Sequence, residues 1–220
     1  HGAVDSTTRT GALGEKSAGS RRVRIGSPGR PPRVHWGAMK AIDPALAHRV
    51  PPGQVLTEKF PVLTYGGTPR FDPATWSFRC FGLVEREVSW TWDEFLALPR
   101  VRVESDIHCV TTWSRLDNVW EGVSMREILR HVTPKPEAKY VLQHAEQGYT
   151  TNTSLEDLLS DDVLLALRHD GADLEPDHGG PLRMVVPKLY FWKSAKWLRG
   201  LEFLDVNPPG FWERAGYHMN

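Results

Sequence analysis

The chain has 220 residues, of which 40% are hydrophobic and 25% are charged, as is typical of a globular protein with a sizeable buried core. Lys plus Arg and Asp plus Glu number 27 each, so the formal net charge is zero, which argues against a nucleic-acid-binding protein. Two cysteines exclude a disulfide framework, a four-cysteine zinc site and an iron–sulfur cluster. No run approaches the ~18 apolar residues of a membrane helix, so we expect no membrane-spanning segment.

Residues 1–33 are rich in Gly, Ser, Pro and Arg, a composition that predicts a flexible basic arm. The Arg21–Arg22 pair in this arm resembles a twin-arginine export signal. Gly, Ser and Pro follow it, however, where an apolar stretch should stand. We therefore expect a cytoplasmic protein, or a periplasmic one whose signal has been removed.

Residues 34–59 are expected to be irregular, because Pro44 and the Pro51–Pro52 pair interrupt them. The compact part is expected to begin near "KFPVLTYGG", residues 59–67. We interpret residues 34–220 as a single domain.

The stretch "WSFRCFGLV" alternates between large apolar and polar residues, which is typical of a strand with one buried face. Trp76, Phe78 and Cys80 share the predicted apolar face, so we interpret Cys80 as a packed thiol. Further strands or buried runs are predicted at "VRVESDI" (101–107), "KYVLQHA" (139–145), "DVLLALRHDG" (162–171), "PLRMVVP" (181–187) and "WLRGLEFLDV" (197–206).

Two short helices are predicted between these strands. In "TWDEFLALP", Thr91 and Glu94 have the spacing of a capping box, and a proline ends the run. In "SMREILRHV", Ser124 and Glu127 have the same spacing. Many short strands with few short helices indicate an α+β fold rather than a doubly wound α/β sheet. No G-x-G-x-x-G or G-K-[ST] loop for a nucleotide is present.

Cys109 stands in "DIHCVTTWS", after a predicted strand and before a run of hydroxyl side chains. Strand ends often carry functional residues, and a thiolate needs polar or metal neighbours. The pattern leaves a packed thiol and a functional thiol both open. A Cys–His nucleophile pair is a further alternative, with four candidate bases: His108, His144, His178 and His218. His108 is disfavoured because adjacent strand residues point to opposite faces, and no hydrolase signature such as G-x-S-x-G is present.

The stretch "DHGGPLRMVVPKLYFWKSAKWLRGLEF" combines paired glycines after His178 with basic side chains and the Ser194 hydroxyl. Glycine lets the backbone approach a ligand closely, and cations with hydroxyls suit a phosphate or another oxyanion. The cations are Arg183, Lys193, Lys196 and Arg199. The alternative is a solvated basic face beside a strand. Near the end of the chain, Tyr217 and His218 are either acid–base groups or ordinary packing residues.

These motifs occur in the order found in a known family. "DIHCVTTWS", "DHGGPLRMVVP", "WKSAKWL" and "FWERAGYH" resemble the molybdopterin-binding domain of the sulfite oxidase family. That family includes protein-methionine-sulfoxide reductase catalytic subunits and plant-type nitrate reductases. The similarity covers residues 59–218 and extends to the compact bacterial sulfite-oxidase-like proteins that consist of this domain alone. It implies the sulfite oxidase-type α+β fold with mixed sheets, and a molybdenum oxidoreductase with one pyranopterin (molybdopterin).

The resemblance also implies roles for individual residues. Cys109 matches the single protein ligand of molybdenum, for which a soft thiolate is suited. Tyr217 matches the tyrosine on the substrate side of the metal, where it would position substrate or relay a proton. His178 and Arg183 match residues that bind the pyranopterin and its phosphate. The remaining cofactor-binding positions are Leu63, Thr64, Tyr65, Ser194, Ala195 and Lys196.

Sulfite oxidases carry arginines around the metal, one at the position of Leu63 and one shortly after the ligand cysteine. Here "VTTWS" follows Cys109, and the next arginine is Arg115. Fewer cationic donors weaken the recognition of a doubly charged oxyanion. This departure favours the reduction of an S-oxide or N-oxide over the oxidation of sulfite.

The resemblance therefore predicts an enzyme that transfers an oxygen atom to or from a small-molecule substrate, with the metal alternating between Mo(VI) and Mo(IV). The sequence has no motif for a second redox centre, so electrons would be exchanged with an external carrier, a cytochrome or a quinone-linked haem protein. Reduction of an S-oxide such as methionine sulfoxide, or of an N-oxide, is the alternative. A non-catalytic binding domain that retains the fold is a third hypothesis.

Overall fold

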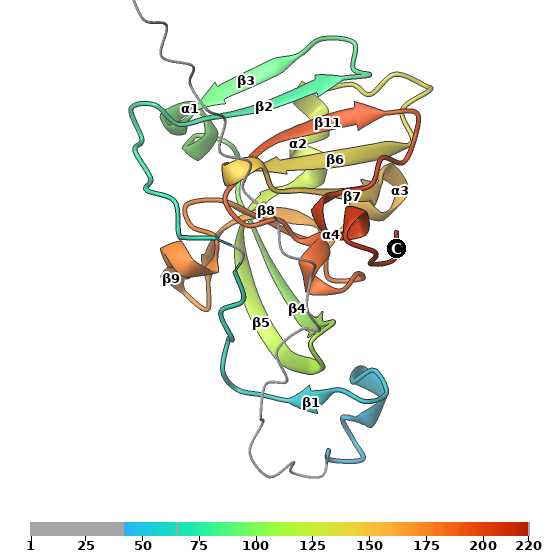
Figure 1. Ribbon diagram of the computed structural model, residues 1–220. Helices are drawn as coiled ribbons and strands as arrows, with labels where there is room; N and C mark the ends of the chain where they lie inside the picture. The colour runs from blue at the N-terminus through green and yellow to red at the C-terminus, as the bar shows by residue number, and fades with distance from the viewer. Residues whose placement is uncertain (1–41, 65, 220) are drawn as a thin grey trace, which may run out of the picture. The chain divides into compact units, whose positions relative to one another are not determined.

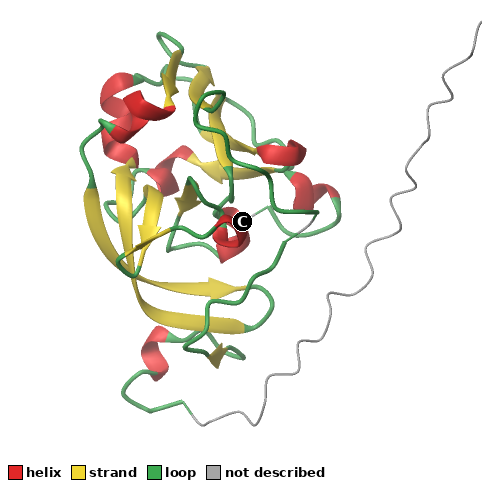
Figure 2. Ribbon diagram, turned by 90° about the vertical axis from the view of Figure 1, so that its left-hand side faces the viewer, coloured by secondary structure: helices red, strands yellow, loops and turns green. Residues whose placement is uncertain are grey.

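The computed structural model of the protein describes residues 42–64 and 66–219 (Figure 1). The predicted arm, residues 1–33, lies outside the described residues, as does Tyr65, so the statements made about them remain predictions. In the described part, the strands form two sheets, and short helices and loops connect them (Figure 2). The predicted α+β class is therefore confirmed. No helix within this part is long and apolar enough to cross a bilayer.

The first sheet, counted over the described residues, has six strands in the order β1–β5–β8–β10, with β4 beside β5 and β9 beside β8. β1 is parallel to β5, whereas β4 and β8 are antiparallel to it. β4 and β5 form a long hairpin, which Figure 1 shows with β1 across its far end. The strands are β1 (Val55–Leu56), β4 (Val101–Cys109), β5 (Trp113–Ser124), β8 (Leu164–His169), β9 (Ala172–Asp173) and β10 (Arg183–Val185).

The second sheet, over the same residues, has five strands in the order β3–β2–β11–β6–β7. Trp76, Phe78 and Cys80 are 5%, 0% and 0% exposed, which confirms the predicted apolar face of β2. The strands are β2 (Ser77–Gly82), β3 (Val88–Thr91), β6 (Tyr140–Ala145), β7 (Thr150–Ser154) and β11 (Leu198–Leu204).

The helices are short and begin where a side chain caps their first turn. Thr91 and Glu94 form the predicted capping box of α1. Ser124 accepts the backbone N–H of Glu127 at 3.1 Å, but the Glu127 carboxylate binds basic side chains of its own helix, so this second box is half formed. The helices are α1 (Trp92–Leu96), α2 (Met125–His131), α3 (Leu155–Leu158) and α4 (Phe211–Arg214), and the 3₁₀ turns are η1 (Ala47–Arg49), η2 (Glu146–Gly148), η3 (Pro176–His178) and η4 (Phe191–Lys193).

β8 is buried on both sides, and its alternate residues point into two apolar cores on opposite faces of the first sheet. Leu165 and Leu167 point into the larger core, which α1, α2 and the second sheet complete. Leu164 and Ala166 point into a smaller core. Strands buried on both faces have nearly continuous apolar sequences, as "DVLLAL" does. The smaller core, which contains Cys109, consists of Ile107, Cys109, Trp113, Trp120, Leu164, Ala166, Leu174 and Val185, with Phe60, Val103 and Phe191 packed against it.

The compact part begins before residue 59, contrary to our expectation. The backbone N–H of Val55 donates to the carbonyl of Thr112 at 2.9 Å. Arg49 binds the Asp106 carboxylate through two nitrogens, at 2.9 and 2.7 Å. The expectation was wrong because these partners lie more than fifty residues away in the sequence, where a local pattern of prolines carries no information about them.

Candidate active site

Cys109 is the last residue of β4, and its side chain faces the smaller core with only 6% of its surface exposed. Burial raises the pKa of this thiol, and hydrogen bonds from Thr111 and Val110 offset only part of the effect. A thiol with a raised pKa is a poor nucleophile at neutral pH, whereas a soft metal cation stabilises the thiolate directly. The imidazole of His108 contacts Ser114 Oγ at 2.8 Å. These features favour a metal ligand over a Cys–His nucleophile.

A buried amide holds the turn that follows Cys109. Gln54, 6% exposed, donates from Nε2 to the Cys109 carbonyl at 3.1 Å. Its Oε1 accepts the hydroxyl of Ser114 at 3.4 Å. The backbone N–H of Thr57 donates to the Ser114 carbonyl at 3.0 Å, so residues that precede "KFPVLTYGG" also support the turn after Cys109. The sequence offered no signal for Gln54, since its partners are more than fifty residues distant.

Arg183 joins two of the predicted cofactor-binding segments. Its guanidinium donates to the carbonyls of His178 at 2.7 Å and Ser194 at 3.0 Å, and it lies 4.0 Å above the ring of Phe191. Arg183 is 2% exposed, and burial lowers its pKa to about 9. A buried cation bound only to neutral groups favours an additional anionic partner.

Lys196 brings a third segment to the same place. Its Nζ donates to the Thr64 hydroxyl at 2.5 Å and to the carbonyls of Leu63 and Asp177, each at 2.9 Å. Burial, together with the charge of Arg183, lowers the pKa of Lys196 to about 8. Leu63, Thr64 and Lys196, which the resemblance implies are cofactor-binding, are thus adjacent.

Two phenylalanines connect this cationic region with Cys109. Phe60 stacks on His178 with ring centroids 4.0 Å apart, and Phe191 lies under Arg183. Both phenylalanines also pack against the smaller core that contains Cys109. Phe60 and Phe191 therefore contact His178 and Arg183 and also border the core that contains Cys109.

The backbone of the Ser194–Lys196 segment is fixed by internal hydrogen bonds. The Ser194 hydroxyl accepts the N–H of Val186 at 3.0 Å. Gln143, fully buried on β6, accepts the N–H of Ala195 at 3.1 Å and donates to the Lys193 carbonyl at 2.8 Å. Ala195 therefore contributes through its backbone, and Gln143 is a supporting residue that we did not predict.

The four cations of residues 177–203 do not all surround one possible anion site, contrary to the simplest interpretation of the sequence. Lys193 points into the interior, where its Nζ lies 2.6 Å from Glu213 Oε1. Arg199 pairs with Glu146 at 3.4 Å. Arg183 and Lys196 are the two that remain beside the candidate site.

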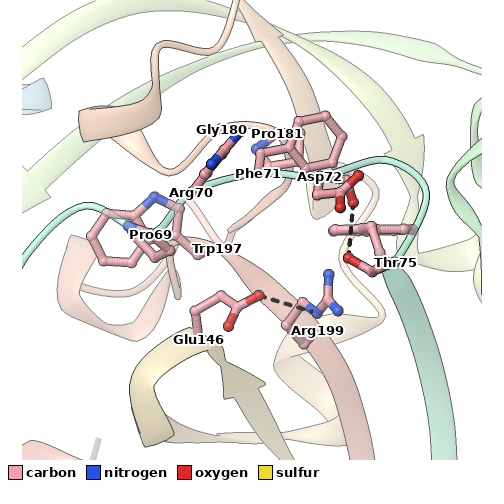
Figure 3. A pocket seen from close by; sticks show the side chains of 11 residues that line it. Pro69, Arg70, Phe71, Asp72, Thr75, Glu146, Gly180, Pro181, Trp197 and Arg199 are labelled. Atoms are coloured by element: carbon pink, nitrogen blue, oxygen red, sulfur yellow. Dashed lines mark hydrogen bonds and ion pairs between the residues drawn. The ribbon is translucent and has the colours of Figure 1, made fainter.

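Arg199 and Glu146 belong to a separate small pocket of about 60 Å³ beside the Gly180–Pro181 peptide (Figure 3). Arg199 and Gly180 from the predicted oxyanion-binding stretch line this pocket, whereas none of the described residues that the resemblance matches to the cofactor site does. Its wall consists of Pro69, Arg70, Phe71, Asp72, Thr75, Trp76, Glu146, Gly180, Pro181, Trp197 and Arg199.

A larger pocket of about 220 Å³ opens between Phe60, His178 and the β8–β9 hairpin. Arg115 lines it, but its guanidinium binds Asp170 at 2.5 Å and also donates to Asn118. Burial lowers the pKa of His169 in this pocket to about 4, although Asp170 opposes the shift, so its imidazole is neutral. The first arginine after Cys109 is therefore neutralised by a carboxylate.

Tyr217 follows α4 in the chain and lies near Trp192 of η4. Its half-buried ring is 6.0 Å from the ring of Trp192 and 5.3 Å from that of Trp212. Trp192 follows Phe191 in η4, so this turn is one connection between Tyr217 and the candidate site. Its position beside substrate stays a prediction.

The donor set fits a molybdenum–pyranopterin cofactor. Within the described residues, no group of three or more His, Cys, Asp or Glu side chains could hold a metal ion, and a metal on Cys109 would take further ligands from a cofactor. A dithiolene and oxo groups supply such ligands. Arg183 and Lys196 donate to carbonyl and hydroxyl oxygens rather than to carboxylates, which leaves their charge available for a phosphate.

The chain matches the family described as "Oxidoreductase molybdopterin binding domain" over residues 65–212. It is 52% identical over 187 residues to the "Uncharacterized oxidoreductase YuiH" of Bacillus subtilis (strain 168), covering 84% of this chain and 93% of that protein. It is 28% identical over 173 residues to the "Protein-methionine-sulfoxide reductase catalytic subunit MsrP" of Gluconobacter oxydans (strain 621H), covering 68% of this chain and 55% of MsrP. The sulfane dehydrogenase SoxCD from Paracoccus pantotrophus shares the fold, with a TM-score of 0.58 and 23% identity over 64% of this chain and 41% of that one.

Proposed function

Because this chain belongs to the oxidoreductase molybdopterin-binding domain family, of the sulfite oxidase type, we propose that it transfers an oxygen atom to or from a small substrate and exchanges electrons with an external carrier. The observation that carries the proposal is the buried Cys109 thiol in the core that Phe60 and Phe191 share. When bound, the cofactor supplies two-electron oxygen-atom chemistry and one-electron exchange with the carrier.

The protein's own groups hold and orient this cofactor. The Cys109 thiolate is the metal ligand, and Arg183 and Lys196 bind the phosphate. Burial, together with the charge of Arg183, lowers the pKa of His178, which keeps its ring neutral and able to hydrogen-bond the pterin. The Tyr217 phenol would donate or accept a proton at the substrate.

A second candidate is the reduction of a neutral S-oxide or N-oxide. It is favoured by the surroundings of Cys109, where Thr111 contacts the sulfur at 3.1 Å and Arg115 is paired with Asp170. A neutral oxide needs hydrogen-bond donors but no cluster of free cations, in contrast to a dianion. An S-oxide takes up two electrons and two protons and leaves as the sulfide and water, with the electrons supplied by the carrier. The name of the relative MsrP gives the same chemistry for that protein.

Steady-state assays separate the two directions. Sulfite is offered with ferricyanide as electron acceptor, and methionine sulfoxide or trimethylamine N-oxide with a reduced viologen as donor. We expect the oxides to be turned over faster than sulfite, and Cys109→Ser to abolish both activities. Full activity of Cys109→Ser contradicts the proposed role of the thiolate. Metal-loaded protein that turns over none of these substrates favours a binding domain instead.

A further inference from the structure

Thr111 contacts the sulfur of the proposed metal ligand. Its Oγ1 lies 3.1 Å from Cys109 Sγ, within hydrogen-bonding distance for sulfur, and the residue is half-buried. A free thiol either donates or accepts in such a contact, whereas a thiolate only accepts. Once a metal has displaced the thiol proton, the hydroxyl of Thr111 must be the donor.

The turn that carries both residues is already fixed by the surrounding backbone and by Gln54. The N–H of Thr112 donates to the Cys109 carbonyl at 2.9 Å, and Gln54 donates to the same oxygen at 3.1 Å. Val55 on β1 donates to the Thr112 carbonyl at 2.9 Å. The Thr111 hydroxyl is therefore held beside the sulfur without any rearrangement, as supporting residues of metal sites usually are.

We propose that Thr111 is a positioning residue of the metal site, whose hydroxyl donates a hydrogen bond to the metal-bound thiolate of Cys109 and raises the reduction potential of the metal. A hydrogen bond to sulfur withdraws negative charge from it, and this stabilises the reduced metal more than the oxidised one. A higher potential favours the transfer of electrons from the carrier to the site. The inference rests on the proposed function, because it requires a metal on Cys109.

Three variants isolate the hydroxyl. Thr111→Val removes it at nearly constant side-chain size, and Thr111→Ser retains it. Thr112→Val is the matched control, because Thr112 is exposed in the same turn and its hydroxyl donates to the Thr111 carbonyl at 2.7 Å. The same exchange of hydroxyl for methyl is thus made at two adjacent residues, of which only Thr111 contacts the sulfur.

Each purified holoprotein is first assayed for molybdenum per chain, and then measured by absorption spectroscopy and by potentiometric titration. In Thr111→Val, we expect the sulfur-to-metal charge-transfer band at longer wavelength, because the sulfur electrons rise in energy. We also expect the ratio of oxidised to reduced metal at a fixed potential to rise by up to about tenfold, or about 59 mV for one electron. Thr111→Ser and Thr112→Val should behave like the wild type.

A band and a potential that do not change in loaded Thr111→Val contradict the inference, and so does an equal shift in Thr112→Val. If Thr111→Val takes up no metal, Thr111→Ala replaces it, since alanine also lacks the hydroxyl and cannot clash. Wild-type protein without molybdenum contradicts the proposed function and this inference with it. Molybdenum-loaded Thr111→Val whose charge-transfer band and reduction potential equal those of the wild type contradicts this inference alone.

Discussion

Replacement of Lys193 by methionine should destabilise the protein strongly, because it leaves the Glu213 carboxylate unpaired in the interior. The Lys193 and Glu213 side chains are 1% and 0% exposed, and Nζ lies 2.6 Å from Oε1. The second carboxylate oxygen, Oε2, has no hydrogen-bond partner. The ammonium also donates to the Asn152 carbonyl at 3.1 Å, to Asn152 Oδ1 at 2.9 Å and to the Met219 carbonyl at 2.8 Å, so the substitution removes four contacts together.

The loss of one partner from a buried ion pair costs about 3–5 kcal/mol of unfolding free energy. For a domain of this size, that corresponds to a fall in Tm of roughly 6–20 °C. The measurement is urea and thermal unfolding of metal-free protein, followed by circular dichroism. Lys188→Met is the matched control, because Lys188 pairs with Asp157 at 2.6 Å on the surface and its loss should change stability little.

The double variant Lys193→Met/Glu213→Leu tests the cause. It removes both charges, so it should be more stable than Lys193→Met alone, although the oxygens of Asn152 and Met219 still lose a donor. The reasoning is refuted if Lys193→Met is as stable as Lys188→Met, or if the double variant is no more stable than the single one.

Three further predictions concern the candidate site. Burial lowers the pKa of Lys196 to about 8 from about 10.5, so the unfolded chain binds the proton more tightly and the stability of metal-free protein rises from about pH 8 to about 10.5. That rise should be smaller in Lys196→Met by urea unfolding, and an unchanged rise contradicts the shift. Gln54→Met leaves the Cys109 carbonyl without its side-chain donor and should lower the free energy of unfolding by about 1–3 kcal/mol, measured with urea. A variant as stable as the wild type would argue against a supporting role of Gln54. A Cβ at Gly180 would lie 2.2 Å from a backbone oxygen, so Gly180→Ala should lower molybdenum content measured by mass spectrometry, unlike Gly67→Ala, which has open space.

Local features of the fold could be predicted from the sequence because neighbouring residues determine them. The apolar face of β2 follows from strict alternation, and the cap of α1 follows from the spacing of Thr91 and Glu94. β5 was missed because its alternation is interrupted. Its register with β4 shifts opposite Ser105 and Ile107, and Asp117 adopts the left-handed region with φ of 55°. Such a bulge moves the later side chains to the other face, so a period-2 pattern breaks down.

Sequence motifs pointed to some residues of the candidate site. Residues whose position depends on partners distant in the sequence were not predicted. The resemblance pointed to Cys109 and Lys196, and their roles at a cofactor stay a prediction. Charge pattern alone also suggested Lys193 for phosphate binding, but that side chain is buried against Glu213, twenty positions further along the chain. Gln54 and Gln143 were not predicted, because the sequence around a glutamine does not show whether its side chain is buried or which distant groups it binds.

The most direct test of the account is the molybdenum and pterin content of protein produced in a host that makes the cofactor. Elemental analysis and fluorescence of the oxidised pterin give both quantities per chain. We predict one molybdenum and one pyranopterin per chain, with molybdenum lost in Cys109→Ser. Protein from such a host that contains neither would contradict the assignment of Cys109 as a metal ligand and the oxidoreductase function with it.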